Sequence, residues 1–275
     1  MLSCGRVRNE IREGLTEIIN TELVNLNMST LKIDSEQTIS FSTNDREFAI
    51  VLIQGECEIK FQSGDGELLG PRNNPFEDMP YAMLVTIDEK VLITAKKPSF
   101  LGIGSSPAQR KMENQIITPK EVSKAIRGTE NWTREVRKVI WSDNTKGNQL
   151  IVGETCTFSG NWSTVPPHRH QYDIPGQEVP YEEIYFFQFS HPKGRGLIWQ
   201  FDEETGLDQA FSLKTNDAVY MNGGYHPVGC MPGTTLYHLT LMAGPHRISQ
   251  ASIHPDYQYL LDEKKIFNQY TPTSN

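Results

Sequence analysis

The segment EFAIVLIQGECEIKFQS, residues 47–63, indicates the fold class of this chain. It is rich in β-branched and other apolar residues, which favour strands, and QGE at 54–56 supplies a glycine-containing turn. We therefore predict a β-hairpin here. Residues 82–97, AMLVTIDEKVLITAKK, repeat the plan, with TIDEK as the turn between two short apolar strands.

Strand patterns return in the second half of the chain, in residues 182–202, 209–233 and 234–244, which are split by Gly, Pro, Asn and Asp. Many short strands at regular spacing are typical of sandwiches and barrels. The two halves have similar length and hairpin spacing, which suggests an internal duplication. The chain is therefore predicted to be all-β, with two domains of one architecture.

The region between the halves has more helical character. Thr118 is a candidate N-cap, and Pro119 occupies the first helical position. We predict a helix and connector over residues 118–147, which joins an N-terminal domain at 1–117 to a C-terminal domain at 148–275.

Composition excludes several classes of protein. Of 275 residues, 37% are hydrophobic and 22% charged, as expected for a globular chain, and the net charge of −8 argues against a nucleic-acid partner. The four cysteines are scattered, with no CxxC motif, which suits reduced thiols in the cytosol. The N-terminus lacks an apolar secretory core, and the longest apolar run, FAIVLI, is too short to cross a membrane. We expect a cytoplasmic protein with no membrane partner.

A histidine-rich stretch, TVPPHRHQYDIPGQEVPYEEIYFF at 164–187, predicts a metal site. Its two histidines are two residues apart, so on a strand both side chains project from one face. Periodicity alone does not choose between the adjacent Glu182 and Glu183 as a third ligand. A later histidine in NGGYHPV would be the fourth, and three imidazoles with one carboxylate suit zinc, manganese or iron.

This order of ligands resembles the metal motif of the cupin barrels. In that motif the glutamate directly precedes the aliphatic residue of its strand, as Glu183 precedes Ile184. The resemblance therefore implies one divalent metal ion, and it implies these ligands: His168, His170, Glu183 and His226.

A more specific resemblance extends over most of the chain. The segments RGTENWTREVRKVI, SGNWSTVPPHRH, GYHPV and MAGPHR, together with the earlier LGPRNNPFEDMPYAM, are similar to the 5-deoxy-glucuronate isomerase family of inositol catabolism. The resemblance implies two cupin (jelly-roll) barrels in one chain. It also implies an aldose–ketose isomerase that converts 5-deoxy-D-glucuronate, a small uronic acid, to 5-dehydro-2-deoxy-D-gluconate.

Such an isomerisation needs a Lewis acid and a group that moves a proton between neighbouring carbons. We predict three catalytic candidates. Tyr185 shares a face with Glu183, Tyr225 precedes the ligand histidine, and Glu182 borders the loop at the barrel mouth.

The carboxylate of the substrate requires an arginine or backbone amides. We favour Arg247, in MAGPHR, over Arg169, which should face away from the metal by alternation. Tyr237 is a second candidate for substrate binding, although only one of Tyr237 and His238 can face the barrel interior. Arg134 lies in a matched segment, where it is equally well explained as an exposed residue.

The N-terminal half has no histidine before His168, so we expect a structural barrel there. Three other functions fit the same fold: a 5-keto-4-deoxyuronate isomerase, a metal cupin dioxygenase, and a non-catalytic sugar-binding cupin. The last should have lost a metal ligand, whereas all four are present. Exposed strand edges on two barrels favour a homo-oligomer.

Overall fold

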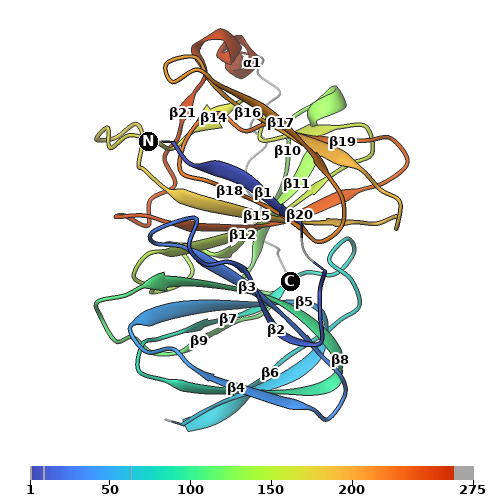
Figure 1. The fold of residues 1–275 in the computed structure, drawn as a ribbon, viewed down its shortest axis with the longest axis vertical. Coiled ribbons are helices and arrows are strands. Elements are labelled where there is room, and N and C mark those ends of the chain that lie inside the picture. The colour runs from blue at the N-terminus through green and yellow to red at the C-terminus, as the bar shows by residue number, and fades with distance from the viewer. Residues whose placement is uncertain (1, 9, 63, 263–275) are drawn as a thin grey trace.

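The computed structural model describes residues 2–8, 10–62 and 64–262 and consists almost entirely of antiparallel strands. Two β-rich lobes lie one above the other in Figure 1. The only helical elements among the described residues are single short turns: η1 (Glu130–Trp132), η2 (Pro255–Tyr257) and α1 (Tyr259–Asp262). The all-β prediction is confirmed.

The N-terminal lobe is one strongly bent sheet with the order β2-β3-β8-β5-β7-β9; β4 pairs with β8, and β6 pairs with β5. Two long strands, β5 and β8, run through its whole length and pair with each other. Its strands are β2 (Gly14–Ile19), β3 (Asn27–Ile33), β4 (Thr38–Ser42), β5 (Arg46–Phe61), β6 (Gly64–Arg72), β7 (Tyr81–Val85), β8 (Lys90–Pro107) and β9 (Gln115–Ile117).

The C-terminal lobe is built from a sheet with the order β1-β18-β15-β20-β12-β11-β10, a second sheet with the order β13-β19-β16-β17, and the pair β14-β21. The first sheet comprises β1 (Cys4–Arg8), β10 (Ser123–Arg127), β11 (Arg134–Ile140), β12 (Leu150–Thr157), β15 (Glu182–Phe189), β18 (Asp217–Met221) and β20 (Leu236–Ala243). The others are β13 (Trp162–Ser163), β14 (His168–Arg169), β16 (Gly196–Asp202), β17 (Leu207–Leu213), β19 (Val228–Cys230) and β21 (Ser252–Ile253).

Alternation along the strands separates three apolar layers. On β5, Ile50 and Leu52 fill the interior of the N-terminal lobe, whereas Ala49 and Val51 pack against the C-terminal lobe. On β20, Leu239 and Leu241 face that same interlobe layer. Both faces of these strands are buried, which explains why FAIVLI reads as a continuous apolar run rather than an alternating one. A third cluster fills the C-terminal lobe beneath the site described below.

The hairpin predicted at QGE is wrong, because β5 continues through it as one strand with shifts in its pairing register. Gly55 provides the bend, with φ of 108°, and a Cβ there would lie 2.3 Å from the Ser99 hydroxyl oxygen. The glycine is needed for this close approach rather than for a reversal. The predicted turn at TIDEK does separate β7 from β8, although β5 lies between those two strands in the sheet.

The helix predicted within residues 118–147 is also wrong. The Glu121 carboxylate accepts hydrogen bonds from the Thr118 backbone N–H and from the Thr118 hydroxyl, as in a helix N-cap. Only a single turn follows this contact, however, before strand β10 begins. Cross-strand pairing of β10, β11 and β12 overrides the local helical signals. Residues 4–8 are hydrogen-bonded into the C-terminal sheet as well, while the domain boundaries themselves stay a prediction.

The four cysteines, Cys4, Cys57, Cys156 and Cys230, are free thiols. Over the described ranges, no helix has the length and apolar character needed to span a bilayer.

Candidate metal centre and active site

Three of the predicted ligands meet inside the C-terminal lobe. His170 follows β14, Glu183 is the second residue of β15, and His226 lies just before β19. Their ligand atoms lie within 4.8 Å of one another, and all three residues are buried. Glu183 Oε2 is 2.8 Å from Nε2 of His170 and 3.3 Å from Nε2 of His226.

His168 lies at the edge of this cluster. Its ring centroid is 5.3 Å from that of His226 and 6.3 Å from that of His170, but it is not one of the three residues whose ligand atoms converge. It is partly exposed and faces a cavity, whereas the other two histidines are enclosed. The fourth predicted ligand is therefore adjacent to the cluster rather than within it.

Backbone carbonyls fix the tautomers of two histidines. Nδ1 of His226 donates to Gly224 O at 2.9 Å, and Nδ1 of His168 donates to Pro166 O at 3.2 Å. Since a carbonyl only accepts, each Nε2 carries a lone pair. The buried Nε2 of His226 has no hydrogen-bond partner. An imidazole oriented through Nδ1 with its Nε2 left for a ligand is the usual arrangement at protein metal sites, so the donor set fits a divalent transition metal.

The charges of Glu183, His168 and His226 suit the same role, whereas the Glu183 carboxylate outweighs burial and raises the pKa of His170, so a metal ion would have to displace a proton there. Burial alone would raise the pKa of Glu183, but the neighbouring histidines lower this pKa to about 2, so the carboxylate is ionised at neutral pH. Burial, reinforced by the other histidines, lowers the pKa of His168 to about 3, and burial also lowers the pKa of His226. Neutral imidazoles and an ionised carboxylate are the protonation states that bind metal ions.

Tyr185 and His238 extend the polar lining of the barrel. Tyr185 lies two residues after Glu183 on β15, and its ring centroid is 5.9 Å from that of His226 and 4.5 Å from that of His238. Burial and the Glu183 charge raise the pKa of Tyr185 well above its usual value, so the phenol keeps its proton. Of the pair Tyr237 and His238, it is His238 that faces the interior.

Gln200 is an interior residue that the sequence analysis missed. The backbone pairing of Phe201 with Tyr225 and of Ile198 with Val228 makes Gln200 the cross-strand neighbour of His226. Its side chain is fully buried, and neither its amide nitrogen nor its amide oxygen has a hydrogen-bond partner. In the sequence LIWQFD, Gln200 could have been noticed as a polar residue in an otherwise apolar strand. Only the pairing register of the strands, however, places it beside His226.

Glu182 and Tyr225, two predicted catalytic residues, point away from the cluster. The Glu182 carboxylate accepts from the backbone N–H groups of residues 24–26 in the N-terminal lobe, at 2.6–3.0 Å. The Tyr225 ring packs against His254 at 4.6 Å and beneath the Arg169 guanidinium at 5.3 Å. Strict alternation explains both outcomes, because each residue is a direct neighbour of a ligand that points inward.

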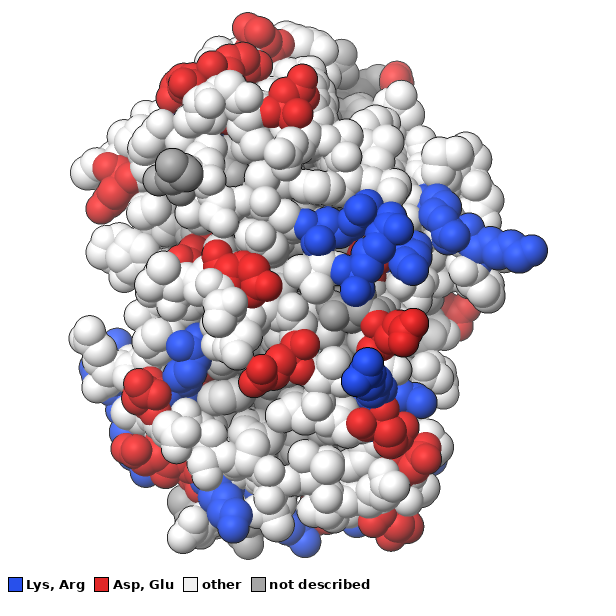
Figure 2. All heavy atoms as spheres, viewed as in Figure 1, with Lys and Arg blue, Asp and Glu red and all other residues white. Residues whose placement is uncertain are grey.

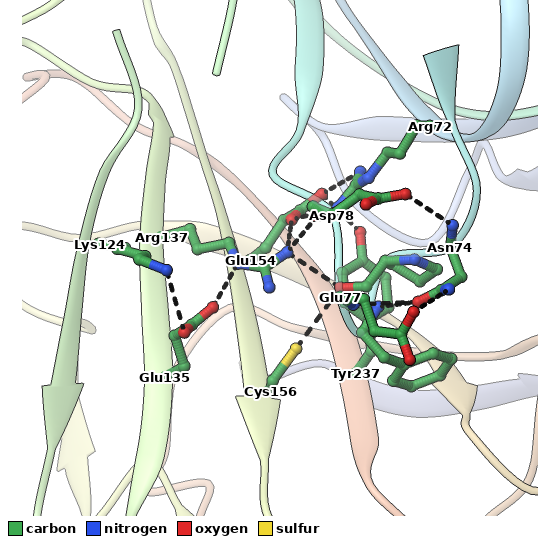
Figure 3. A network of polar contacts seen from close by, with 12 residues as sticks. Arg72, Asn74, Glu77, Asp78, Lys124, Glu135, Arg137, Glu154, Cys156 and Tyr237 are labelled. Carbon is green, nitrogen blue, oxygen red and sulfur yellow. Dashed lines mark hydrogen bonds and ion pairs between the residues drawn. The ribbon is translucent and has the colours of Figure 1, made fainter. Parts of the chain in front are cut away.

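The two predicted substrate-binding residues also have structural partners. Arg247 donates to Leu150 O, Thr145 O and the Thr145 hydroxyl, at 2.7–2.9 Å. The Tyr237 hydroxyl donates to the buried Glu154 at 2.9 Å, within an interlobe network shown in Figure 3. Neither side chain lines the cavity beside His168.

That cavity has a volume of about 620 Å³ and is lined by His168, at the edge of the cluster, but not by His170, Glu183 or His226. Its wall is formed by the inward faces of β10, β11 and β12 together with the loop before β14. Most of the side chains that line it are polar or charged: Arg127, Arg134, Lys138, Ser142, Asp143, Thr155, Thr164, His168 and Ser249.

The sequence model of the KduI/IolB family matches residues 9–260. The chain belongs to the KduI/IolB family. Similar relatives include a 5-deoxy-glucuronate isomerase of Geobacillus kaustophilus, 30% identical over 236 residues that cover 85% of this chain and 84% of the relative. Another is that of Halalkalibacterium halodurans, 27% identical over 93% of this chain and 97% of the relative.

Solved structures agree with this family assignment. An IolB-like protein from Salmonella typhimurium superposes with a TM-score of 0.88 at 25% identity, over 94% of this chain and 99% of that one. An oxalate decarboxylase of Lactobacillus farciminis superposes with a TM-score of 0.64 at 11% identity, over 96% and 94% of the two chains. The second likeness concerns the fold alone. The prediction of two cupin barrels in one chain is confirmed.

Proposed function

We propose that this KduI/IolB family member is a 5-deoxy-glucuronate isomerase. It would convert the aldehyde of 5-deoxy-D-glucuronate to the ketone of 5-dehydro-2-deoxy-D-gluconate. The reaction moves one hydrogen from C2 to C1 and one from the C2 hydroxyl to the C1 oxygen, so it needs no external oxidant or reductant. The supporting observation is a buried His170–Glu183–His226 cluster in a chain whose similar relatives carry that activity in their names.

The cluster and His168 are the residues we propose to hold one divalent ion, with zinc, manganese and iron as the candidates. The orphaned Nε2 of His226 and the ionised Glu183 support this assignment. When bound, the ion supplies Lewis acidity toward the carbonyl and hydroxyl oxygens of the substrate. His168 borders both the cluster and the cavity, so a sugar in the cavity would approach the centre from its side.

Tyr185 is the residue we propose for proton delivery. Its raised pKa keeps the phenol protonated at neutral pH, so its hydroxyl is a donor to an oxygen of the substrate rather than a base. Gln200 presents a buried amide to the same space and can orient a hydroxyl group. The enclosing apolar cluster excludes water, which strengthens these contacts.

The test is proton NMR of the metal-loaded protein with 5-deoxy-D-glucuronate, with Glu183→Gln as the matched inactive control. We expect the aldehyde and hemiacetal signals to disappear while those of the keto acid grow. In deuterated water, incorporation of deuterium at the new CH₂OH carbon identifies proton transfer, whereas its absence is the outcome of a hydride shift or of a proton transfer that is faster than exchange with solvent. Turnover of a 5-keto-4-deoxyuronate in place of the 5-deoxy acid would overturn the substrate assignment.

We propose in addition that the enzyme is cytoplasmic and self-associates. The four free thiols support a reducing compartment. Strands β9, β10 and β17 end their sheets and leave backbone edges for pairing. Light scattering coupled to size-exclusion chromatography would give the mass; a value of one chain, 31.2 kDa, would refute self-association.

A further inference from the structure

A group of buried charges lies at the loop that separates His170 from Glu183. Figure 2 shows charged side chains of both signs at the surface of one face of the molecule. By contrast, the carboxylates of Glu178 and Asp202 are fully buried, and the side chain of Arg169 is only 12% exposed. The Arg169 guanidinium lies 3.9 Å from Glu178 and 3.5 Å from Asp202. Burying an ion pair costs desolvation energy that often exceeds the attraction gained, so stability alone does not explain this arrangement.

The Glu178 carboxylate holds the start of that loop. Its Oε1 accepts from the backbone N–H groups of Gln171 and Tyr172, at 2.6 and 2.8 Å. The backbones of Ile174 and Glu178 pair with each other, so the loop closes on itself as a small hairpin. The backbone of Gln171, which directly follows the candidate ligand His170, is therefore fixed.

The Gln171 side chain reaches the turn that carries His226. Its Oε1 accepts from the backbone N–H of Gly224 at 2.9 Å, and Gly224 O accepts from Nδ1 of His226 at the same distance. A Cβ on Gly223 would lie 2.6 Å from the same Gln171 oxygen, so the glycine is needed for this close approach. Gln171 thus links the segment of one ligand histidine to the carbonyl that orients the other.

The turn is also anchored on either side of this contact. Asn222 N donates to Ser3 O at 3.1 Å, and the backbones of Tyr225 and Phe201 pair at 2.9 and 3.0 Å. Loss of the glutamine acceptor would therefore leave the turn attached at both ends. It would release only the peptide next to the orienting carbonyl of Gly224.

We propose that Gln171 is a positioning residue for the metal centre, because it couples the segments that carry His170 and His226. It acts through the turn rather than by binding the ion, and Arg169 and Glu178 hold its backbone in place. This inference rests on the metal centre of the proposed function but not on the substrate. Outer contacts that orient metal ligands typically contribute a factor of about 10 to 100 to metal affinity.

The test is the affinity of metal-stripped protein for Co²⁺, measured by competition with a chelator. The visible absorption of the bound Co²⁺ is a second readout, because it reports the arrangement of the ligands. We expect Gln171→Met to weaken Co²⁺ binding by about 10- to 100-fold and to change the spectrum at an unchanged melting temperature, since methionine keeps the length of the side chain but loses the acceptor. Gln171→Glu keeps an acceptor oxygen and should retain near-parental affinity and the parental spectrum.

Gln177→Met is the matched control. Gln177 lies in the same loop, but its amide donates to the Ser252 hydroxyl at 3.3 Å, away from the turn of His226, so we expect parental Co²⁺ affinity. Parental affinity and spectrum in Gln171→Met, or equal losses in Gln171→Met and Gln171→Glu, would overturn the inference. So would an equal loss in Gln177→Met, which would assign the effect to the loop as a whole.

Turnover separates this inference from the proposed function. Failure of the parent protein to isomerise 5-deoxy-D-glucuronate, with the expected order of Co²⁺ affinities intact, would refute the proposed reaction and leave the positioning role standing. A parent protein that binds no Co²⁺ would overturn the metal centre and the role of Gln171 with it.

Discussion

The fully buried carboxylate of Glu154 allows a sharp test of how the two lobes are joined. Arg72, from the N-terminal lobe, donates to both oxygens of this carboxylate at 2.8 Å (Figure 3). Arg137 donates at 3.1 Å and the Tyr237 hydroxyl at 2.9 Å. Glu154→Gln keeps the shape of the side chain but removes its charge, and it turns an amide N–H toward a guanidinium N–H.

The expected loss of stability is large, because the substitution leaves buried guanidinium groups without their counter-charge. Breaking a buried ion pair in this way costs about 3–5 kcal/mol. For a chain of this size that lowers the melting temperature by on the order of 10 °C. Arg137 retains its contact with Glu135 at 2.7 Å, so we expect the larger share of the loss to arise at Arg72.

The pH dependence has a definite sign. Burial alone would raise the pKa of Glu154, but Arg72 and Arg137 lower it below the value of an unfolded glutamate. The carboxylate therefore stabilises the fold above about pH 4.3, and this contribution is lost as pH falls through the lower folded-state pKa. The difference in stability between parent and variant should be full at pH 7 and shrink under acid conditions.

The assay is differential scanning fluorimetry together with urea unfolding of the parent, Glu154→Gln, the single variants Glu154→Leu and Arg72→Met, and the double variant Glu154→Leu/Arg72→Met. The double variant should be more stable than Glu154→Leu alone, because it removes both charges together. A loss below about 1 kcal/mol for Glu154→Gln, or strict additivity in the double variant, would refute this account of the network.

Three further variants separate catalytic from structural roles. Glu182→Ala should cost about 1–3 kcal/mol of stability, because it removes the acceptor for three backbone N–H groups, and it should leave kcat unchanged. A large loss of kcat in the folded variant would instead support the predicted catalytic role of Glu182. Tyr185→Phe should lower kcat by about 10²–10⁴-fold at unchanged metal content, and near-parental turnover would contradict proton delivery by this phenol. Gln200→Met should raise stability by about 1 kcal/mol while lowering kcat/KM, since it removes a buried amide that has no hydrogen-bond partner. A destabilised variant would show that the Gln200 amide contributes to the stability of the fold.

The residues that converge were accessible from sequence because together they resemble the metal motif of the cupin barrels. Glu183 was selected from the adjacent Glu182 by its place in a motif, and strand alternation then dictates that the two carboxylates face opposite lobes. The two-residue spacing of His168 and His170 placed both on one face of a strand, and the order of the motif supplied His226, which the structure shows to be buried beside His170.

The positions of the other predicted residues relative to the candidate site depend on pairing between strands that are distant in sequence. Tyr237 and Arg247 are aromatic and cationic side chains near the right strand, but their partners are Glu154 and the backbone at Thr145, which no local pattern reveals. The capping signal at Thr118 failed for the same reason, because sheet pairing around β11 outweighed one helical turn. Gln200 was missed because its significance lies in its register with the strand that carries His226.

The central claim is that the His168–His170–Glu183–His226 set is a metal centre on which isomerisation depends. The most direct measurement adds a divalent ion back to chelator-stripped protein while turnover of 5-deoxy-D-glucuronate is followed by NMR. We expect no turnover by stripped protein, a rise that saturates at one equivalent per chain, and no recovery in Glu183→Gln. Full turnover by the stripped protein, or saturation at one equivalent in Glu183→Gln with parental activity, would contradict this claim.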